Sequence, residues 1–119
     1  MEDYEALKNS LVSIASELFR FKQVFERILS GYPLDVQKKY ISQYNWFSKR
    51  VEQALEVANL KVVDLTRKEF DPGMPVTAVN LDDFSPEDRL YIEQMIEPVV
   101  MEDNKVKKAG TVILGRFEV

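Results

Sequence analysis

The side chains with most scope for chemistry are carboxylates in the second half of the chain. They are Asp71, Asp82, Asp83, Glu87, Asp88, Glu102 and Asp103. Paired carboxylates can serve general acid–base catalysis, and their oxygens bind hard cations. This spacing matches no calcium-binding loop, and Asp82 and Asp83 precede a Ser-Pro turn, where acidic side chains commonly stay solvated. We therefore predict no catalytic residue and no metal site.

The chain contains neither cysteine nor histidine. This excludes disulfides, thiol nucleophiles, Cys/His zinc sites and Ser-His-Asp triads. Its 4 glycines are scattered and form no phosphate-binding loop. We expect a protein that is not an enzyme and holds no cofactor.

The charge of the chain is unevenly distributed. Residues 1–60 hold 8 basic and 8 acidic residues, whereas residues 61–119 hold 8 basic and 12 acidic ones and so carry the whole net charge of −4. This balance argues against nucleic-acid binding and favours a basic protein partner. No apolar run approaches the roughly 18 residues of a membrane helix, and the start is acidic where a signal peptide would be basic. We expect a cytoplasmic protein with no membrane partner.

The first thirty residues carry apolar side chains at alternating intervals of three and four, which is typical of a helix with a heptad seam. The stripe is wider than a two-stranded seam, so it fits either a helix packed on its own domain or one helix of a four-helix bundle. We expect a homodimeric bundle, because only the second helix offers this stripe a mate within the chain. Its interface residues would be Leu7, Leu11, Ile14, Leu18, Phe21, Phe25 and Ile28.

A second helix is predicted from Leu34 to about Asn59, after a turn at residues 30–33 that contains Gly and Pro. Its stripe is Tyr40, Tyr44, Phe47, Val51, Ala54 and Ala58. Trp46 lies off this stripe and would be either a flank contact or an interface anchor. The two helices form an αα-hairpin, so residues 1–59 are predicted to be a helical dimerisation segment.

Residues 60–119 lose the helical period and read as a small β-rich domain, giving an α+β fold. Short strands are predicted near residues 61–65 and 76–79. Residues 86–96 carry both a helix-capping signal at Ser85-Pro86 and the apolar alternation of a strand, and we favour the strand. A polar turn at residues 102–104 and a buried strand at residues 111–114 complete a hairpin-like end.

Lys105, Lys107 and Lys108 precede that last strand. Such a cluster is either a solvated hairpin face or the charged rim of a protein interface.

This order of parts resembles the C-terminal half of GrpE, the nucleotide exchange factor of the DnaK-type heat-shock chaperone. The resemblance covers about residues 45–117 and rests on residues 55–63, the intact Phe70-Asp71-Pro72, the Ala78-Val79 pair and residues 105–114. The His-Glu pair that follows Phe-Asp-Pro in the family is replaced here by residues 74–77. The Gly-Tyr before the basic turn is missing, and the long N-terminal helix pair is cut short.

The resemblance implies a cochaperone of the stress response that binds the nucleotide-binding domain of a DnaK-type chaperone and promotes ADP release. The partner-binding residues that it implies are Phe70, Asp71, Pro72, Met74, Lys105, Lys108 and Val112. An alternative is a helical-hairpin adaptor that binds another protein without exchange activity.

Overall fold

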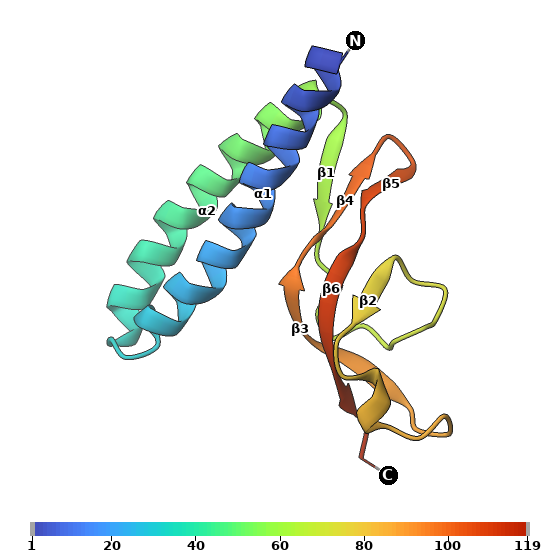
Figure 1. Cartoon of the computed structure of the whole chain (residues 1–119). Helices are drawn as coiled ribbons and strands as arrows, with labels where there is room; N and C mark the ends of the chain where they lie inside the picture. The colour runs from blue at the N-terminus through green and yellow to red at the C-terminus, as the bar shows by residue number, and fades with distance from the viewer. Residues whose placement is uncertain (1, 119) are drawn as a thin grey trace. The chain divides into compact units, whose positions relative to one another are not determined.

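The computed structural model describes residues 2–118 and has an α+β fold (Figure 1). Two helices, α1 (Glu2–Leu29) and α2 (Leu34–Val57), come first. They are followed by β1 (Leu60–Val63), β2 (Val76–Ala78), a short 3-10 helix η1 (Leu81–Asp83), β3 (Leu90–Glu97), β4 (Val99–Glu102), β5 (Lys105–Lys108) and β6 (Gly110–Arg116). The chain divides into two compact units, Met1–Lys61 and Val62–Val119, so the division falls within β1, close to the boundary predicted at residues 59/60.

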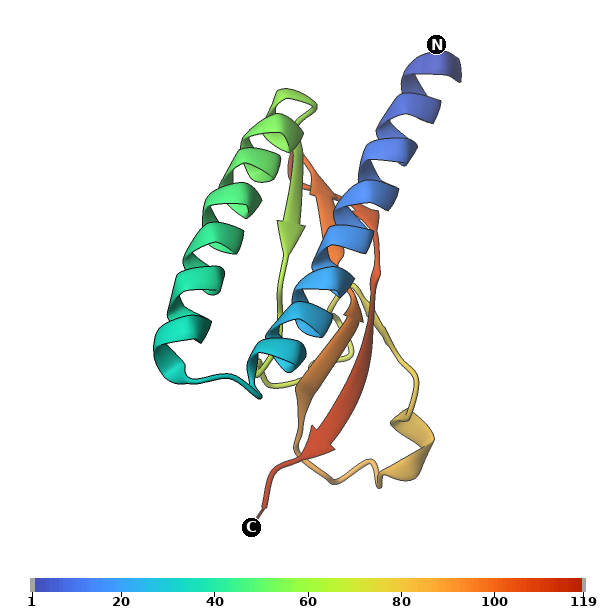
Figure 2. The same cartoon turned by 90° about the vertical axis from the view of Figure 1, so that its left-hand side faces the viewer.

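The first unit is an antiparallel helical hairpin (Figure 2). The turn between the helices lies where Ser30 to Pro33 predicts it, and Pro33 occupies the N-cap of α2. At the other end of α2, Asn59 has φ 61°, the left-handed conformation that Asn tolerates and that ends a helix. The predicted helix boundaries are thus confirmed to within two residues.

The helices contact each other through aromatic side chains. The Phe25 and Tyr44 rings stack with centroids 5.8 Å apart, and Phe21 stacks on Phe25 at 5.9 Å. The Tyr44 hydroxyl donates a hydrogen bond to the Leu18 carbonyl (3.2 Å), so this ring is held at both its face and its tip. Burial, and to a lesser degree the negative charge of Glu26, raises the pKa of Tyr44.

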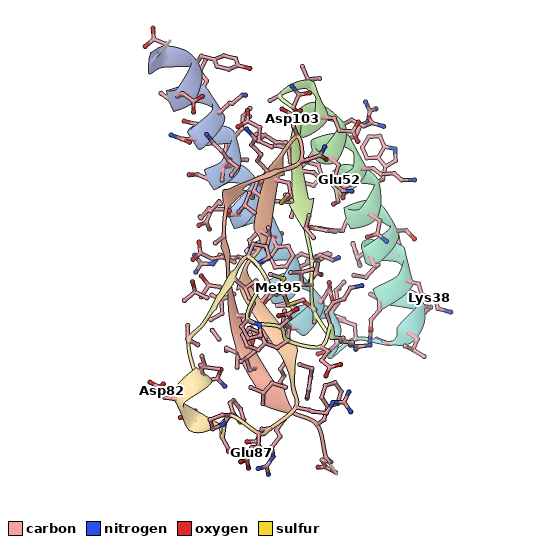
Figure 3. All side chains as sticks on the ribbon, turned by 90° about the vertical axis from the view of Figure 1, so that its right-hand side faces the viewer. Lys38, Glu52, Asp82, Glu87, Met95 and Asp103 are labelled. Atoms are coloured by element: carbon pink, nitrogen blue, oxygen red, sulfur yellow. The ribbon has the colours of Figure 1, made fainter. Side chains whose placement is uncertain are left out.

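The second unit is built on a long bent hairpin. One arm is β3 followed by β4, the other is β5 followed by β6, and Asp103 lies at the tip with φ 56° (Figure 3). Pro98 interrupts the first arm, because proline offers no amide hydrogen to a ladder. Ala109 separates β5 from β6 in the second arm. The hairpin belongs to two three-stranded sheets, ordered β1-β4-β5 and β2-β6-β3, within the region predicted as a small β-rich domain.

Residues 90–97 form a strand, as favoured from the sequence, and the helix alternative is wrong. The capping signal is nevertheless used, because Ser85 N–H donates to Asp88 Oδ2 (2.9 Å) and Asp88 N–H to the Ser85 carbonyl (3.0 Å) in a closed turn. The alternation is not regular along β3. A register shift against β6 turns Met95 inward in place of Gln94, so the buried set is Leu90, Ile92 and Met95.

The strand β6 is the centre of the second sheet, pairing parallel with β2 and antiparallel with β3. Val112 and Leu114, within the segment predicted as most buried, are 0% and 1% exposed. Beyond the end of β2, the side chain of Asn80 makes the hydrogen bonds to β6 that the backbone of a neighbouring strand would otherwise make. Its Nδ2 donates to the Leu114 carbonyl and its Oδ1 accepts from the Leu114 N–H, both at 2.9 Å. This pair fixes the position of η1 at the edge of the sheet.

Candidate partner-binding surfaces

The heptad stripe of α1 divides into two halves with different surroundings. Leu11, Leu18 and Phe25 are half-buried. Leu7, Ile14, Phe21 and Ile28 stay 66%, 61%, 52% and 58% exposed. The buried apolar positions of this part of α1 are instead Val12 and Ala15, beside the stripe. We call the four exposed positions the apolar ridge of α1.

The second helix extends this ridge. Tyr40 and Phe47 are also seven residues apart and are 42% and 49% exposed. Tyr40 lies four residues before Tyr44 and Phe47 three residues after it, so both project from the same side of α2 relative to Tyr44, the residue that faces α1. Because the two helices are antiparallel, Tyr40 and Phe47 lie on the same face of the hairpin as Ile14 and Phe21. Interface residues were predicted on α1 alone, although the apolar period of α2 already carried this signal.

Trp46 is 63% exposed, so it does not pack as a flank contact within its hairpin. The guanidinium of Arg50 lies 4.7 Å from its ring centroid, a cation–π distance. A shallow hollow beside it is lined by Ser42, Gln43, Trp46 and Phe47. The indole is therefore available at the surface of α2.

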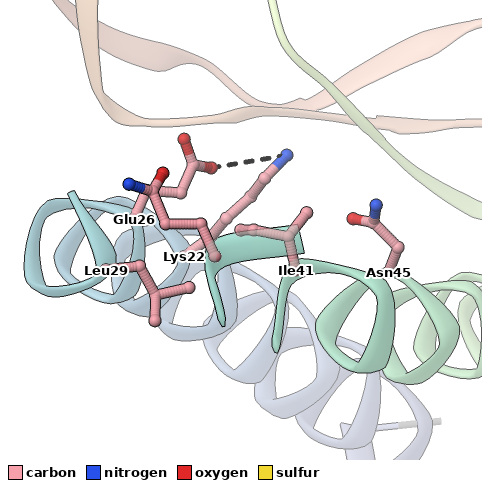
Figure 4. A pocket seen from close by; sticks show the side chains of 6 residues that line it. Lys22, Glu26, Leu29, Ile41 and Asn45 are labelled. Atoms are coloured by element: carbon pink, nitrogen blue, oxygen red, sulfur yellow. Dashed lines mark ion pairs between the residues drawn. The ribbon is translucent and has the colours of Figure 1, made fainter. Parts of the chain in front are cut away.

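A second hollow lies between the two helices near their turn (Figure 4). It is lined by Lys22, Glu26, Leu29, Gln37, Ile41 and Asn45 and has a volume of about 410 Å³. The Nζ of Lys22 and the Oε1 of Glu26 stand 3.9 Å apart, so the two charges of this hollow form an exposed ion pair.

In the second unit, the turn at residues 70–74 presents its polar part to solvent. Phe70 N–H donates to the Leu90 carbonyl (2.8 Å), which ties the turn to β3. Asp71 Oδ1 accepts from Gly73 N–H (2.9 Å), and the Asp71 carbonyl accepts from Met74 N–H (2.9 Å). Asp71 and Pro72 are exposed, whereas Phe70 and Met74 are half-buried. The carboxylate of Asp71 thus shapes the turn as well as facing solvent.

The lysine cluster is less basic than its sequence suggests. Lys108 Nζ lies 3.0 Å from Glu97 Oε2, and Lys107 Nζ lies 3.9 Å from Glu102 Oε1. Lys105 is exposed beside the hairpin tip. Because β5 is an edge strand of its sheet, lysines along it also oppose edge-to-edge pairing with another chain.

The predicted partner-binding residues are only partly brought together. Gly110 N–H donates to the Pro75 carbonyl (3.0 Å), so the end of the 70–74 turn lies near the start of β6, just after Lys108. Lys105 lies farther along the hairpin, at its tip. Val112 is 0% exposed at the centre of the sheet, so the role implied for it as a direct partner contact is wrong in this structure. Its backbone pairing with Ala78 and Met95 makes it a core residue.

The carboxylates singled out from the sequence do not gather into a cluster. Asp82 is exposed in η1, Glu87 is exposed in the following turn, and Asp103 lies at the hairpin tip (Figure 3). Within residues 2–118, no group of three acidic side chains is placed to hold a metal ion. One exposed pair is well formed: Arg89 Nε and Nη2 donate to the two Glu69 oxygens at 3.0 and 3.2 Å, which lowers the pKa of Glu69.

Neither helix of the described chain combines the length and apolar character needed to cross a bilayer.

No family model matches the chain, and comparisons with curated proteins and with solved structures also give no match.

Proposed function

We propose that this chain is a homodimeric, GrpE-like cochaperone that binds the nucleotide-binding domain of a DnaK-type chaperone and promotes ADP release. The proposal starts from the sequence resemblance at residues 45–117. The observation that carries it is a helical hairpin with an unpartnered apolar ridge, followed by a β unit that holds the Phe-Asp-Pro turn at its surface.

Dimerisation would cover the apolar ridge of α1. The helix spans 28 residues, about 42 Å at 1.5 Å per residue, and the ridge follows it for most of that length. Burying Ile14 and Phe21 against a second copy would remove large apolar side chains from water, at about 25 cal/mol per Å² of apolar surface. Tyr40 and Phe47, which are also exposed, would widen the contact in a four-helix bundle of two hairpins.

The exchange activity requires no catalytic group on this chain. A partner that binds the open state of the chaperone more tightly than the closed state shifts the population toward the open state. Because ADP favours the closed state, linkage lowers the affinity for ADP by the same factor. In this scheme the 70–74 turn contributes Asp71 and Pro72 to the contact, and Lys105 contributes charge at its rim.

The decisive experiment measures release of fluorescent ADP from the DnaK-type chaperone of the same organism, with and without this protein. Acceleration would support the exchange function. Lys105→Glu should slow association without changing the free energy of unfolding, whereas Lys61→Glu, the same charge change at an exposed position of β1, should leave association unchanged. Absence of both acceleration and complex formation would refute the proposal.

The dimer has a separate test. Ile14→Asp and Phe21→Asp should each convert a dimeric sedimentation mass into a monomeric one, because each would place a carboxylate in the apolar interface. Ser13→Asp, at an exposed neighbouring position of α1, is the matched control and should stay dimeric. A wild-type protein that sediments as a monomer at micromolar concentration would contradict the dimer.

The adaptor alternative is favoured by one observation, the exposure of Trp46 on α2. An adaptor would form a stable complex with a partner without accelerating ADP release. The same ADP-release assay, combined with a binding measurement, therefore separates the two functions.

A further inference from the structure

The outward side of α2 combines basic and aromatic side chains in a regular pattern. Lys39, Gln43, Trp46 and Arg50 follow one another at intervals of four, three and four, which places them in one line along the helix. This line lies on the side opposite Tyr44, which faces α1. Ser42 and Lys49 flank it, and we call these six residues the outer face of α2.

The middle of α2, residues 36–51, carries positive charge, although the whole protein is acidic. Residues 36–51 contain four basic residues, Lys38, Lys39, Lys49 and Arg50, and no acidic residue, whereas the whole chain has a net charge of −4. All four are exposed, and Lys38 projects outward from the helix (Figure 3).

Five basic side chains elsewhere in the chain have carboxylate partners. Arg20, Lys22, Arg89, Lys107 and Lys108 stand within 4.0 Å of a carboxylate, at 3.4, 3.9, 3.0, 3.9 and 3.0 Å. In the part of the chain that the structure describes, no ion pair involves Lys38, Lys39, Lys49 or Arg50. The outer face thus keeps its positive charge available to another molecule.

The apolar component lies between the charges. Trp46 is 63% exposed and borders the hollow formed with Ser42, Gln43 and Phe47. Tryptophan and arginine are the residue types most enriched among side chains that dominate binding energy at protein interfaces. An indole framed by cations suits a partner that offers an apolar side chain between carboxylates.

We propose that the outer face of α2 docks an acidic segment of another protein. Lys39 and Arg50 are eleven residues apart, so their backbone positions are separated by about 16 Å along the helix. The partner segment would therefore place acidic residues about 16 Å apart, with an apolar residue between them that packs on Trp46. This docking is independent of the chaperone activity proposed above and of the apolar ridge of α1.

The observations favour a protein over the other polyanions. A membrane-bound helix buries a broad apolar face, whereas this line holds one indole among lysine, glutamine and arginine. Nucleic-acid binding draws on a basic face that neutralises many phosphates, and residues 61–119 hold 12 acidic residues against 8 basic ones. The outer face holds three cations, Lys39, Lys49 and Arg50, and one exposed indole, which match a short acidic segment better.

The test uses the intact protein and a helical, alanine-based peptide with paired glutamates at both ends of an eleven-residue span and leucines between them. Trp46 is the only tryptophan, so its emission reports directly on this face. Binding should move the emission to shorter wavelength as the indole leaves water. Affinity should fall at least severalfold when ionic strength rises from about 0.1 to about 1 M, where the Debye length shrinks from about 10 to about 3 Å.

Variants assign the contact to named side chains. Trp46→Ala should lower the affinity at least about tenfold by calorimetry, as for an interface anchor, and should leave the far-ultraviolet circular dichroism unchanged because the indole is exposed. Lys39→Glu and Arg50→Glu should each weaken binding severalfold. Lys61→Glu, the same charge change at an exposed position outside α2, should bind like the wild type.

Several results would overturn the proposal. They are the absence of an emission shift, equal binding of a peptide with lysine in place of glutamate, and unchanged affinity of Trp46→Ala. Tighter binding of oligothymidylate or of phosphatidylserine vesicles than of the acidic peptide would assign the face to another class of ligand. A change in sedimentation mass on Trp46→Ala would assign it to a second copy of this chain. None of these results depends on whether the protein releases ADP from a chaperone.

Discussion

Replacing Asn80 by alanine should destabilise the second unit strongly, although the residue belongs to no strand. Its amide makes two hydrogen bonds of 2.9 Å with the backbone of Leu114, which is 1% exposed. Alanine would leave a buried N–H and a buried C=O without partners, and each such loss costs about 1–3 kcal/mol. We therefore expect the free energy of unfolding to fall by about 2–4 kcal/mol. With a urea slope of about 1–3 kcal/mol per molar, this lowers the unfolding midpoint by about one molar or more.

Urea unfolding followed by circular dichroism and by amide hydrogen exchange of Leu114 measures this effect. Asn104→Ala, at an exposed turn position of the same unit, is the matched control and should change stability by less than about 0.5 kcal/mol. A loss below about 0.5 kcal/mol for Asn80→Ala would refute the argument that the side chain replaces a strand.

Asn80→Asp adds a pH signature to the same position. The carboxylate still accepts from the Leu114 N–H but faces the Leu114 carbonyl, so its pKa in the folded state should lie above the value of about 3.9 for an unperturbed Asp. A protonated carboxyl can donate as the amide does. Because the folded-state pKa is raised, stability should be present at low pH and should be lost as pH rises through that raised pKa. A variant whose stability does not recover on acidification would contradict this reasoning.

Three further measurements follow from the structure. Gly115→Ala should destabilise the protein by about 1–3 kcal/mol in thermal or urea unfolding, because a Cβ would lie 2.7 Å from Tyr91 Cζ. In an NMR titration, the pKa of Glu69 should lie below the ordinary value of a glutamate and should return toward it in Arg89→Gln, since the Arg89 guanidinium holds the pKa down. Burial raises the pKa of Tyr44, so its ionisation in a spectrophotometric titration should lie above the ordinary value of about 10. Its contribution to folding stability is therefore present below that pH and is lost as pH rises through the folded-state pKa. Tyr44→Phe should remove this part of the alkaline transition.

Local signals in the sequence were sufficient for most element boundaries. The turn at residues 30–33, the helix end at Asn59 and the polar turn at residues 102–104 all depend on backbone preferences of single residues, which act without tertiary contacts. The burial of residues 112 and 114 followed from an apolar run in a polar context. The α+β class could be predicted for the same reason.

The candidate site was predicted less completely, because the sequence does not show which side chains meet. The three lysines look alike in the sequence, yet Lys107 and Lys108 have carboxylate partners from the opposite arm of the hairpin, whereas Lys105 lies at its tip. Val112 matched a motif of the resemblance but is buried. Trp46 could be read from the sequence either as packed or as an anchor, and its exposure favours the second.

What the sequence determined by itself is the order of the elements, the type of most of them and the existence of an apolar stripe on each helix, since these depend on residue spacing and local backbone preference. The tertiary structure decided which half of the α1 stripe meets α2 and which half remains exposed, because that choice depends on how the helix is rotated in its hairpin. It also decided the register shift that turns Met95 inward and the pairing of Asn80 with Leu114. Both arise from contacts between residues distant in sequence, where no local pattern acts.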